Sequence, residues 1–184
     1  MAYIDPAVWR ARTFRAENPV IIHRVRDPFG WMGNMSPFPV VHEGVRYRST
    51  EHLFQCLRVE DPEVQKAIRE ESNPLKAKMI ARKHADKRTV VCLSEDDLDL
   101  MRLCLKLKLD QHPAFQDRLQ ETEGQHIIEN CTSRPRGTGL FWGAALEDGV
   151  WSGMNWLGEL WMEARQELLS QPRKDEDLIG SLFQ

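Results

Sequence analysis

The longest helix that the sequence predicts, residues 94–110, is apolar on nearly every side. Ser94 is expected to cap its first turn, because Asp97 follows three residues later, a spacing typical of a helix start. A helix with apolar side chains all round must be covered by other elements. We therefore expect the rest of the fold to pack around this central helix. Its apolar side chains are Leu98, Leu100, Met101, Leu103, Cys104, Leu105, Leu107 and Leu109.

Shorter elements are predicted on both sides of this helix. Asp61-Pro62 and Asn73-Pro74 each place a capping residue before a proline, the pattern of a helix N-terminus. Short β-branched or alternating segments bounded by Gly, Pro or Asn favour strands. The further helices are predicted at 62–71, 74–86, 113–122 and 155–171, a strand pair at 40–45, and strands or turns at 20–25, 125–130 and 137–145.

Length and composition limit the classes of function. The 184 residues suffice for one sizeable core, so we expect a single domain. The formal net charge of −3 gives no electrostatic basis for tight, sequence-independent binding of duplex DNA. The four cysteines lack C-x-x-C spacing and the six histidines lack H-x-x-x-H spacing, so no metal site is predicted. With no apolar leader and no apolar run near 18 residues, we expect a cytoplasmic protein that does not contact a membrane.

A polar stripe begins the helix that opens at Thr50. Glu51, Gln55 and Arg58 are spaced by four and three residues, so they share one helical face. Such a stripe is either a solvated surface or the wall of a pocket. The sequence of this helix alone leaves both interpretations open.

Four other features have two interpretations each. The loop 27–38, rich in Gly, Pro, aromatic residues and Met, either covers the core or closes over a flat ligand. Lys78 and Arg82 share a helical face that is either solvated or able to bind a diphosphate. Trp142 either stacks on a base or fills the core. Asn155 either caps the last helix or places that helix N-terminus against a phosphate.

Four segments together resemble the NADAR family, the NAD- and ADP-ribose-associated domains. Residues 49–58, Ser-Thr-Glu-His-Leu-Phe-Gln-Cys-Leu-Arg, are similar to its E-H-x-F-Q signature. Residues 30–38 resemble its glycine, asparagine and aromatic loop, and Asn73-Pro74 with Ala77, Lys78 and Arg82 resembles its N-P-x-x-A-K region. Asn155, Leu157, Gly158, Met162 and Arg165 are spaced as in its closing helix. The matches keep the family's order over about residues 20 to 170.

The resemblance implies a compact α+β domain, mainly α-helical, with a few short strands. We assign it to residues 1–171 and separate 172–184 as a polar break and a short apolar tail. It also implies hydrolysis of the bond between a base and C1′ of a phosphorylated ribose, without metal or redox cofactor. The implied substrates are phosphoribosyl-aminopyrimidine intermediates of riboflavin synthesis or ADP-ribosyl conjugates, among them ADP-ribosylated guanine presented on DNA. No obligate protein partner is evident.

The resemblance supplies roles for the candidate residues. Glu51 is the expected catalytic carboxylate, because cleavage of C1′–N develops positive charge on the sugar. Phosphate is expected to contact Arg58, Lys78 and Arg82, assisted by the helix N-terminus at Asn155. The base would stack on Trp31 or Trp142. The remaining expected substrate-binding residues are Asn34, His52, Gln55, Gly143 and Gly158.

The chain departs from the family pattern at two positions. Many members carry an acidic residue directly after the Trp-Gly pair, but here Ala144 follows Trp142-Gly143, and Asp148 is the substitute that we assign as the second catalytic acid. Arg58 stands where a lysine is common, which argues against an imine intermediate at that position. The missing acid leaves an alternative function open, namely a catalytically inactive module that binds ADP-ribose or a nucleotide.

Overall fold

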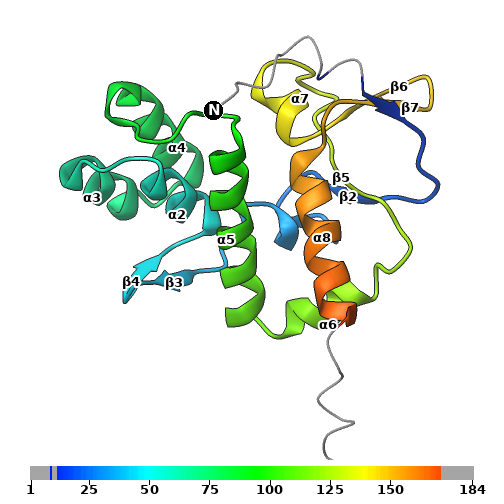
Figure 1. Cartoon of the computed structure of the whole chain (residues 1–184), viewed down its shortest axis with the longest axis horizontal. Coiled ribbons are helices and arrows are strands. Elements are labelled where there is room, and N and C mark those ends of the chain that lie inside the picture. Colours follow the sequence, from blue (N-terminus) through cyan, green and yellow to red (C-terminus); the bar gives the residue numbers. More distant parts are fainter. Residues whose placement is uncertain (1–8, 10–11, 171–184) are drawn as a thin grey trace, which may run out of the picture.

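The structure is a computed structural model that describes Trp9 and residues 12–170. It shows an α+β domain that is mainly α-helical, in agreement with the fold class predicted from the sequence (Figure 1). The tail at 172–184 lies outside the described residues. The helices include α2 (Thr50–Leu57), α3 (Pro62–Glu70), α4 (Pro74–Lys83), α5 (Glu95–Gln111), α6 (Ala114–Gln120), α7 (Thr138–Trp142) and α8 (Trp156–Ser170), with 3₁₀ turns η1 (Gly30–Met32) and η2 (Ala85–Lys87).

Helix α5 lies at the centre of the fold, as its apolar pattern predicts. Ser94 caps it, since the Ser94 Oγ accepts the backbone N–H of Asp97 at 3.4 Å. The helix packs against α2 on one side and α8 on the other, an arrangement visible in Figure 1. One flank is covered less completely than the pattern predicts, because three of its leucines are only half-buried: Leu100, Leu103 and Leu107.

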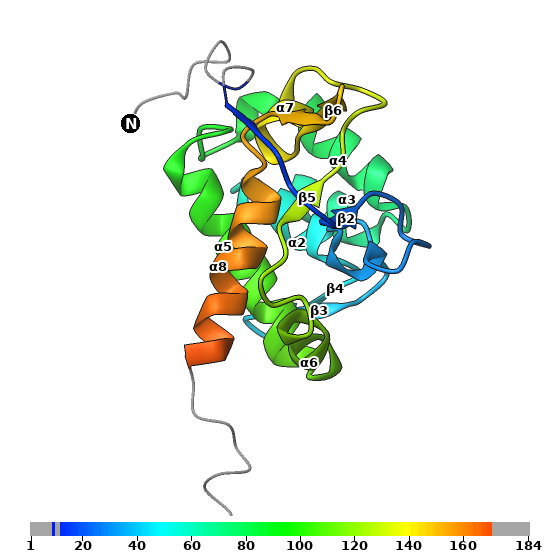
Figure 2. The same ribbon diagram turned by 90° about the vertical axis from the view of Figure 1, so that its right-hand side faces the viewer.

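The strands form three small sheets. Strands β2 and β5 are parallel, with Val20 opposite Ile127 and Ile22 opposite Glu129. Strand β5 packs against α8, and Figure 2 shows β2 and β5 next to each other. Because the carboxyl ends of parallel strands meet at one edge, residues 23 and 24 are brought near Glu129. The strands are β1 (Thr13–Phe14), β2 (Val20–Ile22), β3 (Val40–His42), β4 (Val45–Tyr47), β5 (Ile127–Glu129), β6 (Ala145–Glu147) and β7 (Val150–Ser152), joined as β1-β7-β6, β2-β5 and β3-β4.

Two predicted strands differ from the structure. The strand predicted at 20–25 ends at Ile22, because the Asp27 carboxylate accepts the backbone N–H of Arg24 and the chain turns there. The segment 137–145 contains the short helix α7 before β6, and it begins at Gly137, whose φ of 57° favours glycine. None of the helices among the described residues is both long and apolar enough to cross a membrane.

Candidate active site

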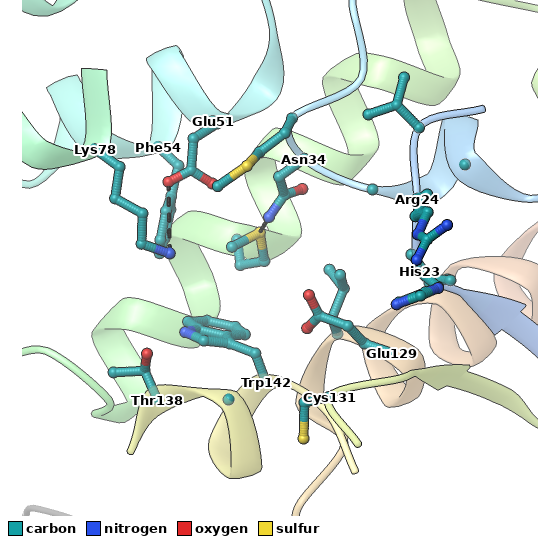
Figure 3. A pocket seen from close by; sticks show the side chains of 18 residues that line it. His23, Arg24, Asn34, Glu51, Phe54, Lys78, Glu129, Cys131, Thr138 and Trp142 are labelled. Atoms are coloured by element: carbon teal, nitrogen blue, oxygen red, sulfur yellow. Dashed lines mark hydrogen bonds and ion pairs between the residues drawn. The ribbon is translucent and has the colours of Figure 1, made fainter. Parts of the chain in front are cut away.

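A cavity of about 430 Å³ opens between α2, α4, α7 and the ends of the parallel strands (Figure 3). The loop that follows β2 forms a further wall. Among the ionisable side chains that line the cavity are Glu51 of α2, Lys78 of α4 and Glu129 of β5, and His23 and Arg24 lie at the end of β2. The cavity therefore combines two carboxylates with basic side chains, which is a composition suited to acid–base chemistry.

Glu51 occupies the first turn of α2. Its backbone N–H donates to the Asn34 carbonyl at 3.0 Å, which joins the helix start to the aromatic loop. The residue is only 4% exposed, and its Oε1 accepts a hydrogen bond from Gln55 Nε2 at 2.8 Å. Lys78 Nζ lies 3.9 Å from the same oxygen. A donor amide and a cation at this carboxylate both stabilise its negative charge. The stripe therefore forms a pocket wall at Glu51, and Gln55 positions the carboxylate.

Glu129 is the second carboxylate, and it is not among the site residues predicted from the sequence. It ends β5 and faces Glu51 across the cavity in Figure 3. Its Oε2 is buried and has no hydrogen-bond partner among the described residues. Burial raises the pKa of Glu129 to about 7, and the negative charge of Glu51 adds to the rise, while Lys78 opposes it. Near neutral pH this group therefore exists both as an acid and as a carboxylate.

Asn155 fixes the backbone at Glu129 instead of binding a ligand at the start of α8. Its Oδ1 accepts the Glu129 N–H at 3.0 Å, and its Nδ2 donates to the Ile127 carbonyl at 2.8 Å. Both polar atoms of the buried side chain are thus used, which corrects the prediction of phosphate binding there. Two glycines let the backbone pack closely against β5. A Cβ at Gly158 would lie 2.0 Å from the Ile127 carbonyl oxygen, and a Cβ at Gly143 would lie 2.2 Å from the Glu129 carbonyl oxygen.

Trp142 presents an aromatic ring to the cavity. It is half-buried and packs edge-on against Phe54 and Phe141, with ring centroids 5.6 Å and 5.0 Å apart. Figure 3 shows the indole on the same side of the cavity as Lys78. Trp142 therefore packs in the core on one edge and also lines the cavity, and its stacking on a base stays a prediction.

The aromatic loop is divided between core and cavity. Gly33, Asn34 and Met35 line the cavity, and Asn34 Nδ2 lies 3.1 Å from Met101 Sδ. Trp31 is 4% exposed and stacks on Phe115, with centroids 4.5 Å apart. The prediction that Trp31 stacks on the base is therefore wrong, because its ring is enclosed by core aromatics.

Lys108 holds this loop from the side of α5. Its buried Nζ donates to the Gly33 carbonyl at 3.0 Å and to Ser36 Oγ at 2.8 Å. Burial lowers the pKa of Lys108 to about 7. Lys108 thus connects the central helix to the loop that forms one wall of the cavity.

Arg58 does not reach the cavity, contrary to the phosphate-binding prediction. Its Nε donates to Asp97 Oδ1 at 2.7 Å, and its NH2 group pairs with Asp97 Oδ2. The Arg58 side chain is 7% exposed and that of Asp97 is fully buried. Asp97 also accepts the backbone N–H of Leu93 at 2.7 Å. The guanidinium therefore neutralises a buried carboxylate between α2 and α5, and its Nε and NH2 groups are both used in that pair.

His52 is likewise a structural residue in this arrangement. Its Nε2 donates to the Glu71 carbonyl at 3.0 Å, which leaves Nδ1 to accept from Ser49 Oγ at 2.8 Å. Burial lowers the pKa of His52, so the ring is neutral at neutral pH. It joins the start of α2 to the turn between α3 and α4, outside the lining of the cavity.

Two further predicted residues lie away from the cavity. Asp148 is exposed at the turn between β6 and β7, with a φ of 49°, so its assignment as the second acid is wrong. Its position shortly after Gly143 in the sequence does not bring it to the cavity, because β6 carries the chain away from the lining residue Trp142. Arg82 is exposed one turn beyond Lys78 and does not line the cavity.

The described residues contain no group of three or more His, Cys, Asp and Glu side chains that could hold a metal ion. The cysteines at 56, 92, 104 and 131 are free thiols.

Comparisons with known proteins agree with the resemblance. The NADAR domain model matches residues 20–169. The protein named N-glycosidase YbiA of Escherichia coli is 26% identical over 144 residues, which cover 77% of this chain and 83% of YbiA. The maize chloroplastic riboflavin biosynthesis protein PYRR is 26% identical over 180 residues, which cover 90% of this chain but 27% of that protein. The NMR structure of E. coli YbiA has the same fold, with a TM-score of 0.67 at 24% identity over 87% of this chain and 94% of YbiA.

Proposed function

The chain belongs to the NADAR domain family and is a hydrolase of N-glycosyl bonds, and we propose that its substrate joins a base to C1′ of a phosphorylated ribose. The observation that carries this proposal is the pair Glu51 and Glu129, which face each other across one cavity with different surroundings. Two carboxylates in unlike environments are the usual arrangement for separate acid and base roles.

Glu129 acts as the general acid in this proposal. Its protonated form donates to the leaving nitrogen of the base while the C1′–N bond breaks. A pKa near 7 suits this role, because a catalytic acid works best when its pKa lies near the working pH. The unpartnered Oε2 is available for that proton transfer.

Glu51 acts as the carboxylate that stabilises the positive charge developing on the ribose. It also accepts the proton of the water molecule that adds its oxygen to C1′. Gln55 and Lys78 orient the carboxylate, and both contacts involve the same oxygen. The second oxygen of Glu51 is therefore free of these two partners and can face the reacting carbon.

Base and phosphate require separate contacts. The exposed part of the Trp142 ring provides a surface for stacking on the base. Lys78, which is 43% exposed, provides positive charge on the α4 side of the cavity. His23 and Arg24 line the cavity at the end of β2 and replace Arg58 and Arg82 as the proposed phosphate contacts.

A catalytically inactive binding module has less support than an enzyme. The main argument for an inactive module is that no acidic residue directly follows Gly143. Glu129 places a second carboxylate in the cavity from another element, and Gly143 packs against its backbone carbonyl. An inactive module would have no need for a buried carboxylate without a hydrogen-bond partner.

Product analysis tests this proposal and chooses between its two substrates. The protein is incubated separately with a phosphoribosyl-aminopyrimidine and with DNA carrying ADP-ribosylated guanine, and the products are separated by chromatography. We expect release of the free base or of unmodified guanine-containing DNA from one of them. Tight binding of either ligand with no product would favour the inactive module instead.

A further inference from the structure

A second hollow, of about 500 Å³, lies beside the cavity on the far side of Met35. Three arginines line it, namely Arg46, Arg48 and Arg69, and we call it the arginine groove. Among the described residues, no carboxylate lines it. The groove is therefore positively charged, although the chain as a whole has a net charge of −3.

The arginines come from elements that converge at the ends of α2 and α4. Arg46 is on β4, Arg48 follows this strand, and Arg69 is in the last turn of α3. Figure 1 shows the β3–β4 hairpin and α3 on the same side of α2. Within residues 12–170, none of the three forms an ion pair with another described residue. Arg69 hydrogen-bonds Tyr47, which fixes its position.

One of the acids adjacent in the chain to the lining residues, Glu71, has its hydrogen-bond partners in the following turn. The Glu71 carboxylate accepts the backbone N–H of Asn73 at 2.9 Å, and its Oε1 is 3.5 Å from Ser72 Oγ. His52 borders the groove but adds no charge, because its ring is neutral. The groove therefore offers guanidinium groups that no carboxylate of its lining neutralises.

The groove and the cavity share walls. Met35 lines both. Of two consecutive residues of α2, Glu51 lines the cavity and His52 lines the groove. On α4, Pro74 borders the groove and Lys78 the cavity. Four residues of an α-helix span about 6 Å, which is close to the distance between neighbouring phosphates of a nucleic-acid strand. A ligand in the cavity could therefore extend into the groove.

We propose that the arginine groove binds a second phosphate of a substrate whose ribose lies in the cavity. Guanidinium groups bind phosphate through paired N–H donors, and two or three arginines around one hollow suit this geometry. The proposal rests on the proposed function for the position of the ribose, and it narrows the substrate class to molecules with at least two phosphates. The second phosphate belongs either to a free diphosphate nucleotide or to a phosphodiester strand.

Equilibrium binding of three probes tests the groove. The probes are AMP, ADP and a fluorescein-labelled single-stranded DNA of about ten nucleotides. The double variant Arg46→Ala/Arg48→Ala removes two of the three arginines, and Arg69 is left in place because it hydrogen-bonds Tyr47. Arg15→Ala, an exposed arginine outside both linings, is the matched control. Thermal unfolding checks that each variant is folded.

We expect the double variant to bind ADP or the DNA roughly ten- to a hundredfold more weakly, while AMP and the control variant change little. If only ADP binds the double variant more weakly, the second phosphate belongs to a free nucleotide. If the DNA binds more weakly, the second phosphate belongs to a strand. In that case the slope of log affinity against log salt concentration should decrease in magnitude by about one for each lost phosphate contact. Equal losses for all three probes, or no loss for ADP and DNA, would overturn the proposal.

These results separate the groove from the proposed function. If base release fails while the double variant still loses affinity for ADP or DNA, the hydrolytic assignment is wrong and the groove remains. If base release proceeds and the double variant binds every probe like the unchanged protein, the groove is wrong and the hydrolytic assignment remains.

Discussion

Replacing Glu129 with glutamine should abolish catalysis and at the same time make the protein more stable above neutral pH. Glutamine keeps the shape of the side chain but can neither donate the acidic proton nor ionise. Loss of a general acid typically lowers kcat by about 10²- to 10⁴-fold. In the unchanged protein, kcat/KM should fall above a pH of about 7, where Glu129 loses its proton. The residual kcat/KM of the variant should not fall in this pH range.

The stability effect follows from the same pKa. In the unfolded chain Glu129 ionises at its ordinary pKa of 4.5, but in the folded protein it ionises only near 7. The folded state therefore binds more protons between these values, and the free energy of unfolding falls as pH rises through this range. Each tenfold change in the ionisation constant is worth about 1.4 kcal/mol, so the cost above pH 7 reaches up to about 3 kcal/mol. Glu129→Gln removes this cost.

Thermal unfolding and steady-state kinetics from pH 4 to 9 measure both effects. For a domain of this size, about 3 kcal/mol corresponds to a rise in Tm of roughly 6–12 °C at pH 8, which should disappear below pH 4.5. The exposed acid Glu147, changed to glutamine, is the matched control. A variant that keeps kcat within about threefold, or that is less stable at pH 8, would refute the assignment of Glu129 as a buried general acid.

Two other changes test the positions found in the structure. Arg58→Ala leaves Asp97 buried without its cation, so we expect a loss of about 3–5 kcal/mol in unfolding free energy, whereas Arg102→Ala, which removes exposed pairs, should cost at most about 1 kcal/mol. Unchanged Tm with a raised KM for the phosphorylated substrate would instead return Arg58 to the site. Burial lowers the pKa of Lys108 from 10.5 to about 7. Between these pH values the unfolded chain therefore binds more protons than the folded protein, so the free energy of unfolding should rise with pH from about 7 to 10. Chemical unfolding of Lys108→Met should lack this rise, and an identical rise in the variant would contradict it.

Local patterns predicted the helices and one side of the site. The i, i+4 spacing of Glu51 and Gln55 indicated their shared face, and the structure joins them by a hydrogen bond. Capping patterns placed the starts of α3, α4 and α5 within one residue of their observed positions, whereas α4 ends three residues before its predicted end at 86. These features depend on neighbours in the sequence, and for this reason they could be predicted.

The residues that were predicted wrongly or missed are those whose positions depend on long-range contacts. Arg58 has its partner, Asp97, 39 residues away, and no local spacing reveals such a pair. Glu129 follows two apolar residues of a short strand and resembled an ordinary strand end. Its burial depends on the pairing of β5 with β2 and on Asn155, 26 residues further along the chain. An isolated acid directly after a buried strand was the available signal.

The most direct test of the account is a single-turnover measurement of base release by Glu51→Gln, with protein in excess over whichever substrate the unchanged protein cleaves. The amide preserves the hydrogen-bonding shape but removes the charge that the sugar requires in the transition state. We predict that the unchanged protein releases the base while the variant releases none above background and binds the substrate within a few fold of the unchanged protein. Release by the variant within about threefold of the unchanged rate would contradict the central claim that the Glu51 carboxylate drives cleavage of the N-glycosyl bond.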